Sequence, residues 1–417
     1  MEISPQAKKI LLIVSFVIVV ALIALAIYYA FFRPIISGPT TNENINDNAN
    51  VTPGGLPNAN SNREVNAVAN GNVNSPFESG LPDIDEIASG SYTSVTTIAD
   101  GIAVDGIPTE DKTGYIYYDA YTKKFYEILP NGEKVELSDR EFYNVDTVAW
   151  SPNRNEAIIS YPDGSNTYYN FSTDQAITLP KEIDNVKFSG SGDKIAYEFL
   201  GDTEQERWLG VSNPNGTGQQ IIEPIGFRED RVDVNWSPDA QVVAVYREGT
   251  GIDEEDVYFL GQHGENFKSL DVEGAGFTGL WSPQGDKMLY SVYSSETDYK
   301  PNLWIVDARG DSLGLNKENL GISTWPDKCA FHGSMLYCAA PVSMPDGAGL
   351  AREIAADEKD VFYEINLETG LATLLAIPYS DDDGSRYSAE GIYISLDGNY
   401  LHFRNTISGK LEKIRIN

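Results

Sequence analysis

The sequence predicts an all-β fold built from a repeated unit, and three observations carry this prediction. An aromatic residue and a Ser-Pro turn follow one another at Trp150, Trp236 and Trp281, with weaker copies at Phe188 and Tyr393. A short apolar run comes after each copy, and this order is typical of a β-hairpin. The spacing of about 45 residues from Trp236 to Trp281 fits four-stranded repeats. The predicted architecture is therefore a β-propeller, with seven blades as the best fit.

Residues 91–417 are expected to form this propeller, because strands follow one another there with almost no helical pattern. Seven blades would take about 47 residues each. The first blade is expected to show three outer strands, at 115–118, 124–129 and 134–137. The sixth and seventh blades should open at Cys329 and Gly391. The seventh has only three strands of its own, so we expect residues 92–99 to supply the fourth and close the ring.

The N-terminal part has the pattern of a membrane anchor. Residues 1–9 are polar, and residues 10–32 run for 23 residues without a charge, a Gly or a Pro. A helix of that length covers about 34 Å, enough to cross a hydrocarbon core of ~30 Å. A cleaved signal peptide is the alternative, but its apolar region is only about 7–15 residues long. We expect an uncleaved single-pass anchor with a cytoplasmic N-terminus, because Lys8 and Lys9 outweigh Arg33.

Residues 33–90 are expected to be a disordered linker. They are rich in Asn, Gly and Pro and show no periodic apolar pattern. Such a segment cannot bury enough apolar surface to offset its chain entropy. The propeller would then stand away from the membrane on a flexible tether, outside the cytoplasm.

The composition narrows the class of partner. The chain has 62 acidic and 30 basic residues, a net charge of −32. This charge repels phosphate backbones, so no nucleic-acid partner is expected. It either keeps the protein soluble or attracts cations and basic partners. Two cysteines in 417 residues exclude a disulfide-rich scaffold.

The Trp-Ser-Pro turns, of which the one at 236–239 is the fullest, resemble the WD40-like (PD40) repeats of TolB-type β-propellers. Those proteins are common in bacterial periplasms and on bacterial surfaces. The resemblance covers residues 91–417 and implies the fold, but such repeats occur in many unrelated proteins and imply no specific activity. TolB-type proteins carry an α/β domain before the propeller, and here the predicted anchor and linker stand in its place. The TolB role in the Tol-Pal system is therefore not carried over.

The repeated aromatic residues are interpreted as structural. Trp150, Phe188, Trp236 and Trp281 occupy equivalent positions in successive units. A residue that every blade repeats serves every blade alike, so packing between blades is the expected role. If Trp236 is buried, its replacement by Ala should cost about 3–5 kcal/mol.

Cys329 and Cys338 are expected to form a structural disulfide. A two-residue turn at 333–334 suits a type II′ hairpin, which takes Gly first. This turn pairs His332 with Met335 and brings Cys329 opposite Cys338 at a non-hydrogen-bonded position, within disulfide reach. Two buried free thiols are the alternative, and a metal site with His332 is a third.

Acidic loops gather on one predicted face of the propeller. They include two runs, Asp253, Glu254, Glu255 and Asp256 in the first and Asp381, Asp382 and Asp383 in the second. Solvated loops are the plain interpretation. The alternative is an anionic mouth that binds Ca²⁺ or a basic partner. Neither run has the spacing of an EF-hand loop, and no other metal or cofactor is expected.

Signals of catalysis are poor. The segment 188–192 fails the first position of a Gly-x-Ser-x-Gly elbow, and the three histidines have no metal-ligand spacing. We therefore expect a non-catalytic binding module of the bacterial cell envelope, with a protein, peptide or glycan partner. An envelope hydrolase acting on a glycan or peptide through acids in the mouth is the alternative. A passive scaffold is the third possibility.

Overall fold

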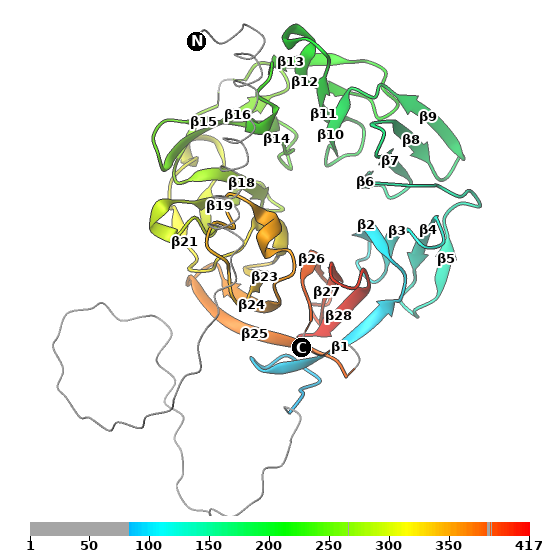
Figure 1. The fold of residues 1–417 in the computed structure, drawn as a ribbon, viewed down its shortest axis with the longest axis vertical. Coiled ribbons are helices and arrows are strands. Elements are labelled where there is room, and N and C mark those ends of the chain that lie inside the picture. The colour runs from blue at the N-terminus through cyan, green and yellow to red at the C-terminus, as the bar shows by residue number, and fades with distance from the viewer. Residues whose placement is uncertain (1–82, 266, 382–383, 385) are drawn as a thin grey trace, which may run out of the picture. The chain divides into compact units, whose positions relative to one another are not determined.

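The computed structural model describes residues 83–265, 267–381, 384 and 386–417. Among these residues the protein is all-β, with 28 strands and six short 3₁₀ turns. The sheets follow one another around a central axis, as the blades of a propeller do (Figure 1). The predicted membrane anchor and nearly all of the predicted linker lie outside the described residues. The described part contains no helix long and apolar enough to span a bilayer.

Five sheets have four strands each, paired in chain order. The first is β2 (Ala103–Pro108), β3 (Tyr115–Asp119), β4 (Lys124–Ile128) and β5 (Lys134–Glu136); the second is β6 (Thr147–Trp150), β7 (Glu156–Ser160), β8 (Asn166–Asn170) and β9 (Gln175–Leu179). The third is β10 (Ile183–Phe188), β11 (Ile195–Leu200), β12 (Arg207–Ser212) and β13 (Gln220–Pro224); the fourth is β14 (Val232–Val234), β15 (Val242–Gly249), β16 (Glu254–Gly261) and β17 (Leu270–Glu273). The fifth is β18 (Ala275–Trp281), β19 (Lys287–Tyr293), β20 (Asn302–Asp307) and β21 (Glu318–Asn319).

The sixth sheet has eight strands, in the order β22-β23-β24-β25-β1-β28-β27-β26. Its members are β22 (Cys329–His332), β23 (Met335–Pro341), β24 (Asp360–Asn366), β25 (Leu371–Tyr379), β26 (Ala389–Ile394), β27 (Tyr400–Asn405), β28 (Leu411–Arg415) and β1 (Tyr92–Ala99). The 3₁₀ turns are η1 (Glu204–Glu206), η2 (Glu229–Arg231), η3 (Ser295–Thr297), η4 (Gly310–Ser312), η5 (Pro326–Lys328) and η6 (Arg352–Ala355).

The N-terminal strand β1 completes the last set of strands, as predicted. It pairs antiparallel with β28, where Val95 lies opposite Ile414, and parallel with β25, where Tyr92 lies opposite Ile377. Residues before the predicted boundary at 91 also attach to the sheets. The Ala88 amide donates to the Arg415 carbonyl and the Gly90 amide to the Leu375 carbonyl. The contacts of the folded body therefore begin before residue 91.

Burial falls from the second strand of a sheet to the fourth. All five residues of β3 are buried, whereas all three of β5 are exposed. The second strands are covered on both faces by neighbouring sheets, so they are continuous apolar runs rather than alternating ones. This is why the short apolar runs after the turns marked the strands so well.

The sequence prediction missed the first strand of the first sheet, β2. Its pairing with β3 shifts register between Val104 and Ile107, and Asp105 has a positive φ of 31°. Gly106 lies in the same bulge, where an added Cβ would come within 2.2 Å of the Tyr115 ring. A bulged strand that contains Asp and Gly has no two-residue alternation, so the sequence pattern did not reveal it.

Two repeat tryptophans link neighbouring sheets through the same hydrogen bond. The Trp150 Nε1 donates to the Asp105 carbonyl at 2.7 Å, and the Trp236 Nε1 donates to the Lys187 carbonyl at 3.1 Å. Each acceptor lies on the first strand of the preceding sheet. Trp150 and Trp281 are 8% and 9% exposed, but Trp236 and Phe188 are only half-buried. Trp150 is therefore the better position at which to measure the contribution of this contact.

The hairpin of β22 and β23 has the predicted register. His332 lies opposite Met335 and Cys329 opposite Cys338. The two cysteines are joined by a disulfide, with their Cα atoms 4.1 Å apart. The next connection, residues 342–359 between β23 and β24, is a long loop that contains the 3₁₀ turn η6.

We predict that Trp150→Ala lowers the free energy of unfolding by about 3–5 kcal/mol, because it leaves a cavity between two sheets and an unpaired carbonyl. Trp150→Phe keeps a ring against Phe125 and Phe171 and should lose less, about 1–2 kcal/mol. Urea unfolding followed by circular dichroism measures both. A Trp150→Ala variant within 0.5 kcal/mol of the unchanged protein, roughly the effect of a surface substitution, would contradict the assignment.

Candidate functional site

One end of the ring carries the longer loops, and we call it the mouth face. Because strands within a sheet are antiparallel, the loops between second and third strands share an end with the links into the next sheet. The described segments of this face include 100–102, 120–123, 137–146, 161–165, 180–182, 201–206, 225–231, 250–253, 294–301, 320–328, 342–359 and 386–388.

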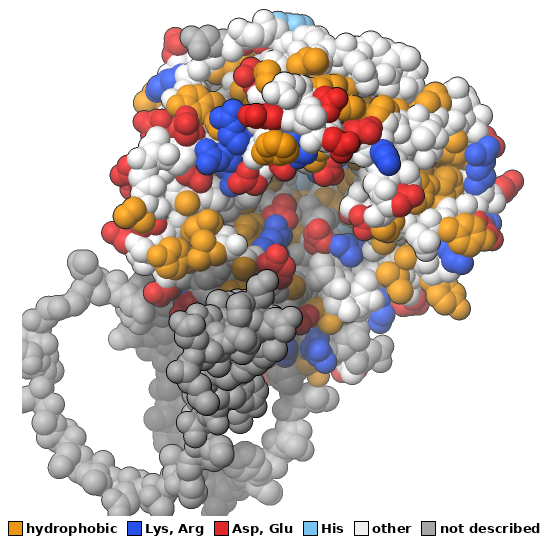
Figure 2. All heavy atoms as spheres, turned by 45° about the horizontal axis from the view of Figure 1, so that its top comes forward, with side chains coloured by type: hydrophobic (Ala, Val, Ile, Leu, Met, Phe, Trp, Pro, Cys, Tyr) orange, Lys and Arg blue, Asp and Glu red, His pale blue; other side chains and the backbone are white. Residues whose placement is uncertain are grey.

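Large hydrophobic side chains are exposed on the mouth face. The most exposed are Ile252 at 93% and Tyr121 at 81%, and the full set is Ile102, Tyr121, Tyr143, Phe227, Ile252, Tyr299, Val342, Leu350 and Ile354. They come from loops within the first, fourth, fifth and eight-stranded sheets and from links between sheets. Figure 2 shows hydrophobic, acidic and basic side chains next to one another around a central hollow. Single exposed hydrophobic residues are ordinary, but a face rich in them is typical of an interaction site.

In the first predicted acidic run, Asp253 and Glu255 have a different role from Glu254 and Asp256. The Glu255 carboxylate accepts hydrogen bonds from the backbone amides of Gly276 and Phe277, each at 3.1 Å. Asp253 accepts from the Ser295 amide at 3.2 Å. Both carboxylates thus bind the next sheet or its loop. These two residues are structural links as well as part of the acidic run.

Glu254 and Asp256 lie on the other face of β16. Glu254 pairs in register with Glu273, and Asp256 with Asp271. Like charges directly opposite one another destabilise a sheet, so these two pairs are a feature that folding alone does not favour. Of the second predicted run, Asp381 is exposed, and Asp382 and Asp383 lie outside the described residues.

The sequence analysis missed a recurring link at the start of third strands. Glu255 on β16 is one member, and Asn166 and Asp360 are the others. The Asn166 Nδ2 donates to the Ile183 carbonyl at 2.7 Å, and the Asp360 Oδ2 accepts from the Ala389 amide at 2.6 Å. Glu255 and Asn166 act across to the first strand of the next sheet, and Asp360 acts across to β26, the last strand in the order of the eight-stranded sheet. Asp360 also forms a buried ion pair with Lys328, with a distance of 2.6 Å between Nζ and Oδ2.

Acidic groups near the central axis have raised pKa values. Burial raises the pKa of Asp105, against the hydrogen bond from the Val148 amide. Burial likewise raises the pKa of Asp233, against the nearby charges of Lys187 and Arg247. Carboxyl groups tuned in this way occur at catalytic sites, and they also occur in structural networks.

Glu198 is the clearest of these groups. It is 4% exposed, and desolvation raises its pKa to about 7. The Asn185 Nδ2 donates to its Oε1 at 2.8 Å, and Asp184 lies opposite it in the strand pairing. The carboxyl group therefore holds its proton over much of the acidic range.

Besides a cavity of about 420 Å³ lined by parts of 325–328 and 352–356, two cavities open at the mouth face. A cavity of about 630 Å³ between the second and third sheets is lined by Asp105, Tyr161, Asp184 and Lys187. A second of about 460 Å³ between the fourth and fifth sheets is lined by Asp253, Glu254, Glu273 and Glu296. The first has mixed charge and the second is strongly acidic.

The described residues contain no group of three or more His, Cys, Asp or Glu side chains placed to hold a metal ion. The Ca²⁺ hypothesis stays a prediction, because part of the second acidic run lies outside this part of the chain.

We predict that Glu255→Ala costs about 2–3 kcal/mol of stability, because it leaves two amides of β18 without their acceptor. Glu254→Ala, one residue away on the opposite face, should change stability by less than about 0.5 kcal/mol. Thermal and urea unfolding measure the stability of both variants, and so compare the loss of an acid that accepts two backbone hydrogen bonds with the loss of its exposed neighbour. Equal effects would show that Glu255 has no special role.

We predict that Glu198→Gln stabilises the protein increasingly as pH rises from about 4.5 to 7. The folded pKa is raised, so the folded state holds a proton that the unfolded state has already lost, and stability falls with rising pH. At roughly 1.4 kcal/mol per unit of pKa, the full effect is about 3 kcal/mol above pH 7. Melting temperatures from pH 4 to 8 test this, with the exposed Glu223→Gln as control. A constant difference between variant and parent would contradict it.

No protein-family model matches the chain, and no curated protein matches it. Solved structures do. An oligogalacturonate lyase in complex with manganese aligns with a TM-score of 0.51 at 13% identity, over 78% of this chain and 93% of that one. The β-propeller domain of Cps50 (Swd1) from Myceliophteria thermophila aligns with a TM-score of 0.51 at 9% identity, over 78% of this chain and all (100%) of that one. At this identity the likeness shows that the chain has the β-propeller fold.

Proposed function

We propose that this chain is a TolB-like, seven-bladed β-propeller that is anchored outside the cytoplasm in a bacterial cell envelope and binds a basic polypeptide segment through its mouth face. Seven blades result when the eight-stranded sheet is counted as two blades joined at β25 and β1. The apolar run 10–32 and the Asn-rich stretch after it support the anchor and the tether.

The observation that carries the proposal is that the mouth face has both exposed hydrophobic side chains and acidic side chains. Exposed hydrophobic side chains such as Phe227 and Ile252 lie among loops that also carry Asp253 and Glu254. Hydrophobic contacts supply affinity at such interfaces, and charge complementarity supplies orientation and rate. A polypeptide with basic and apolar residues satisfies both. A glycan would use the acids and aromatic rings but not the aliphatic side chains Ile252, Val342 and Leu350.

The alternative is an envelope hydrolase acting on a glycan or a peptide. The raised pKa values of Asp105 and Asp233 near the axis favour it. We prefer the binding function to the hydrolase, because the exposed hydrophobic residues are spread over the loops rather than around Asp105 and Asp233.

We predict that the full chain, purified in a mild neutral detergent, binds a fluorescent 12-residue Lys–Trp peptide and not the matched Glu–Trp peptide. The double variant Phe227→Ser and Ile252→Ser should weaken binding at least tenfold, since about 1.4 kcal/mol corresponds to a factor of ten. Raised salt should weaken it further. Fluorescence anisotropy measures the affinities.

Leu396→Ser is the matched control, because Leu396 is 61% exposed on the opposite face. It should leave the affinity unchanged. Equal binding of the two peptides would contradict the proposal. So would an equal loss of affinity in the double variant and in Leu396→Ser. Cleavage of the peptide or of an envelope glycan at a rate that Asp105→Asn abolishes would favour the hydrolase instead.

A further inference from the structure

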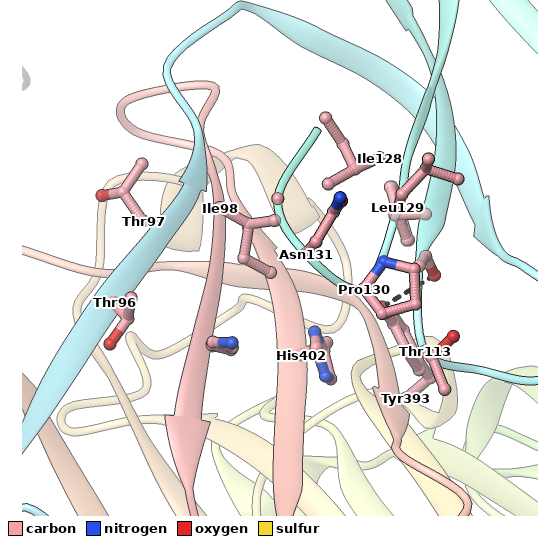
Figure 3. Close-up of a pocket in the computed structure, with 14 residues that line it drawn as sticks. Thr96, Thr97, Ile98, Thr113, Ile128, Leu129, Pro130, Asn131, Tyr393 and His402 are labelled. Carbon is pink, nitrogen blue, oxygen red and sulfur yellow. Dashed lines mark hydrogen bonds between the residues drawn. The ribbon is translucent and has the colours of Figure 1, made fainter. Parts of the chain in front are cut away.

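A small pocket lies where the last strands of the ring meet the first sheet. Its volume is about 210 Å³. One wall is a row of paired residues across four strands, Tyr393 on β26, His402 on β27, Lys413 on β28 and Thr96 on β1. The other wall is the turn 129–132 between β4 and β5. Figure 3 shows His402 below Asn131, with Ile98 to its left and Pro130 to its right.

His402 is a buried polar side chain that this part of the fold leaves incompletely satisfied. The residue is 7% exposed, and its Nδ1 has no hydrogen-bond partner among the described residues. Its ring stacks on that of Tyr393, with centroids 4.5 Å apart and planes at 10°. A buried nitrogen without a partner costs about 1–3 kcal/mol, so a site that keeps one calls for an explanation. The His402 ring also lines the pocket, so a ligand there would lie against it.

Lys413 places a positive charge beside this ring. It lies opposite His402 in the strand pairing, and its Nζ is 4.7 Å from the centroid of the Tyr400 ring. Among the described residues no carboxylate forms an ion pair with it, although acids outnumber bases by 62 to 30 in the chain. A lysine that stays unpaired in so acidic a protein can still accept an anion.

We propose that this pocket binds a small oxyanion, a carboxylate or a phosphate-type group, between the Lys413 ammonium and the His402 imidazole. Thr96 is next in the same row and also lines the pocket. The site joins β1 to the first sheet and so lies where the two ends of the propeller meet. It is independent of the function proposed for the mouth face.

The charge of the pocket gives the site a pH dependence. Burial, and then the charge of Lys413, lower the pKa of His402 to about 4, while the charge of Asp397 acts in the opposite direction. The other titratable groups packed near it are the tyrosines Tyr393, Tyr115 and Tyr400, with Asp111 near Tyr393. A bound anion favours the protonated ring and raises this pKa. Binding therefore takes up a proton and becomes tighter as pH falls toward 4.

The test uses nuclear magnetic resonance of the full chain labelled with ¹⁵N-histidine. The protein has three histidines, so His263 and His332 serve as internal controls. Sulfate, which stays a dianion over this range, represents tetrahedral anions, and acetate represents carboxylates. Both are titrated to 50 mM against chloride at matched ionic strength, at pH 5 and pH 7. We expect one anion or both to move the His402 signals alone, with saturation and at least threefold tighter binding at pH 5.

Lys413→Met should abolish the saturable shift, and Lys181→Met, which removes one charge on the mouth face, should leave it intact. His402→Gln identifies the His402 signals, and unchanged His263 and His332 signals show that each variant is folded. The response to sulfate against acetate decides between a phosphate-type and a carboxylate ligand. No saturable shift with either anion, equal shifts of all three histidines, or a shift that survives Lys413→Met would overturn the proposal.

Discussion

The fold depends on the two-sided pairing of β1. This strand, from the beginning of the folded part, forms hydrogen bonds with β28 at the end of the chain and with β25 of the preceding set. It supplies the outermost strand of the last set and covers an edge that would otherwise be open to pairing with other chains. Closing a loop of more than 300 residues has an entropic cost that grows only slowly with length, so one strand with two partners suffices.

Side chains then fix each sheet to the next. The indoles of Trp150 and Trp236 donate to the first strand of the preceding sheet, and Glu255 and Asn166 act on the first strand of the following sheet. Asp360 acts on β26 across the eight-stranded sheet. These links use acids that a count of charges would assign to ligand binding. Part of the acidic charge of the mouth face therefore has a structural role. Exposed acids such as Glu254 are available to contact a partner.

Local patterns predicted most of the strands and little of the site. The apolar runs after each turn marked strands that are buried on both faces, and the Gly333 turn set the hairpin register from Cys329 to Cys338. The bulged strand β2 was missed because Asp105 and Gly106 break the alternation. The roles of Glu255 and Asp360 depend on partners that are distant in the sequence, and His402 and Lys413 become neighbours of the turn 129–132 only when the ring closes. No local signal carries such contacts.

The two ends of the ring accordingly differ in chemistry. The mouth face combines exposed hydrophobic residues with acids, whereas the pocket near His402 is small and has a positive charge. Both need the ring to close through β1. Hydrogen–deuterium exchange of the full chain, read by mass spectrometry, tests this closure most directly. The account predicts that amides of 95–97 exchange as slowly as those of β28, and exchange of 95–97 within seconds while β26 to β28 stay protected would contradict it.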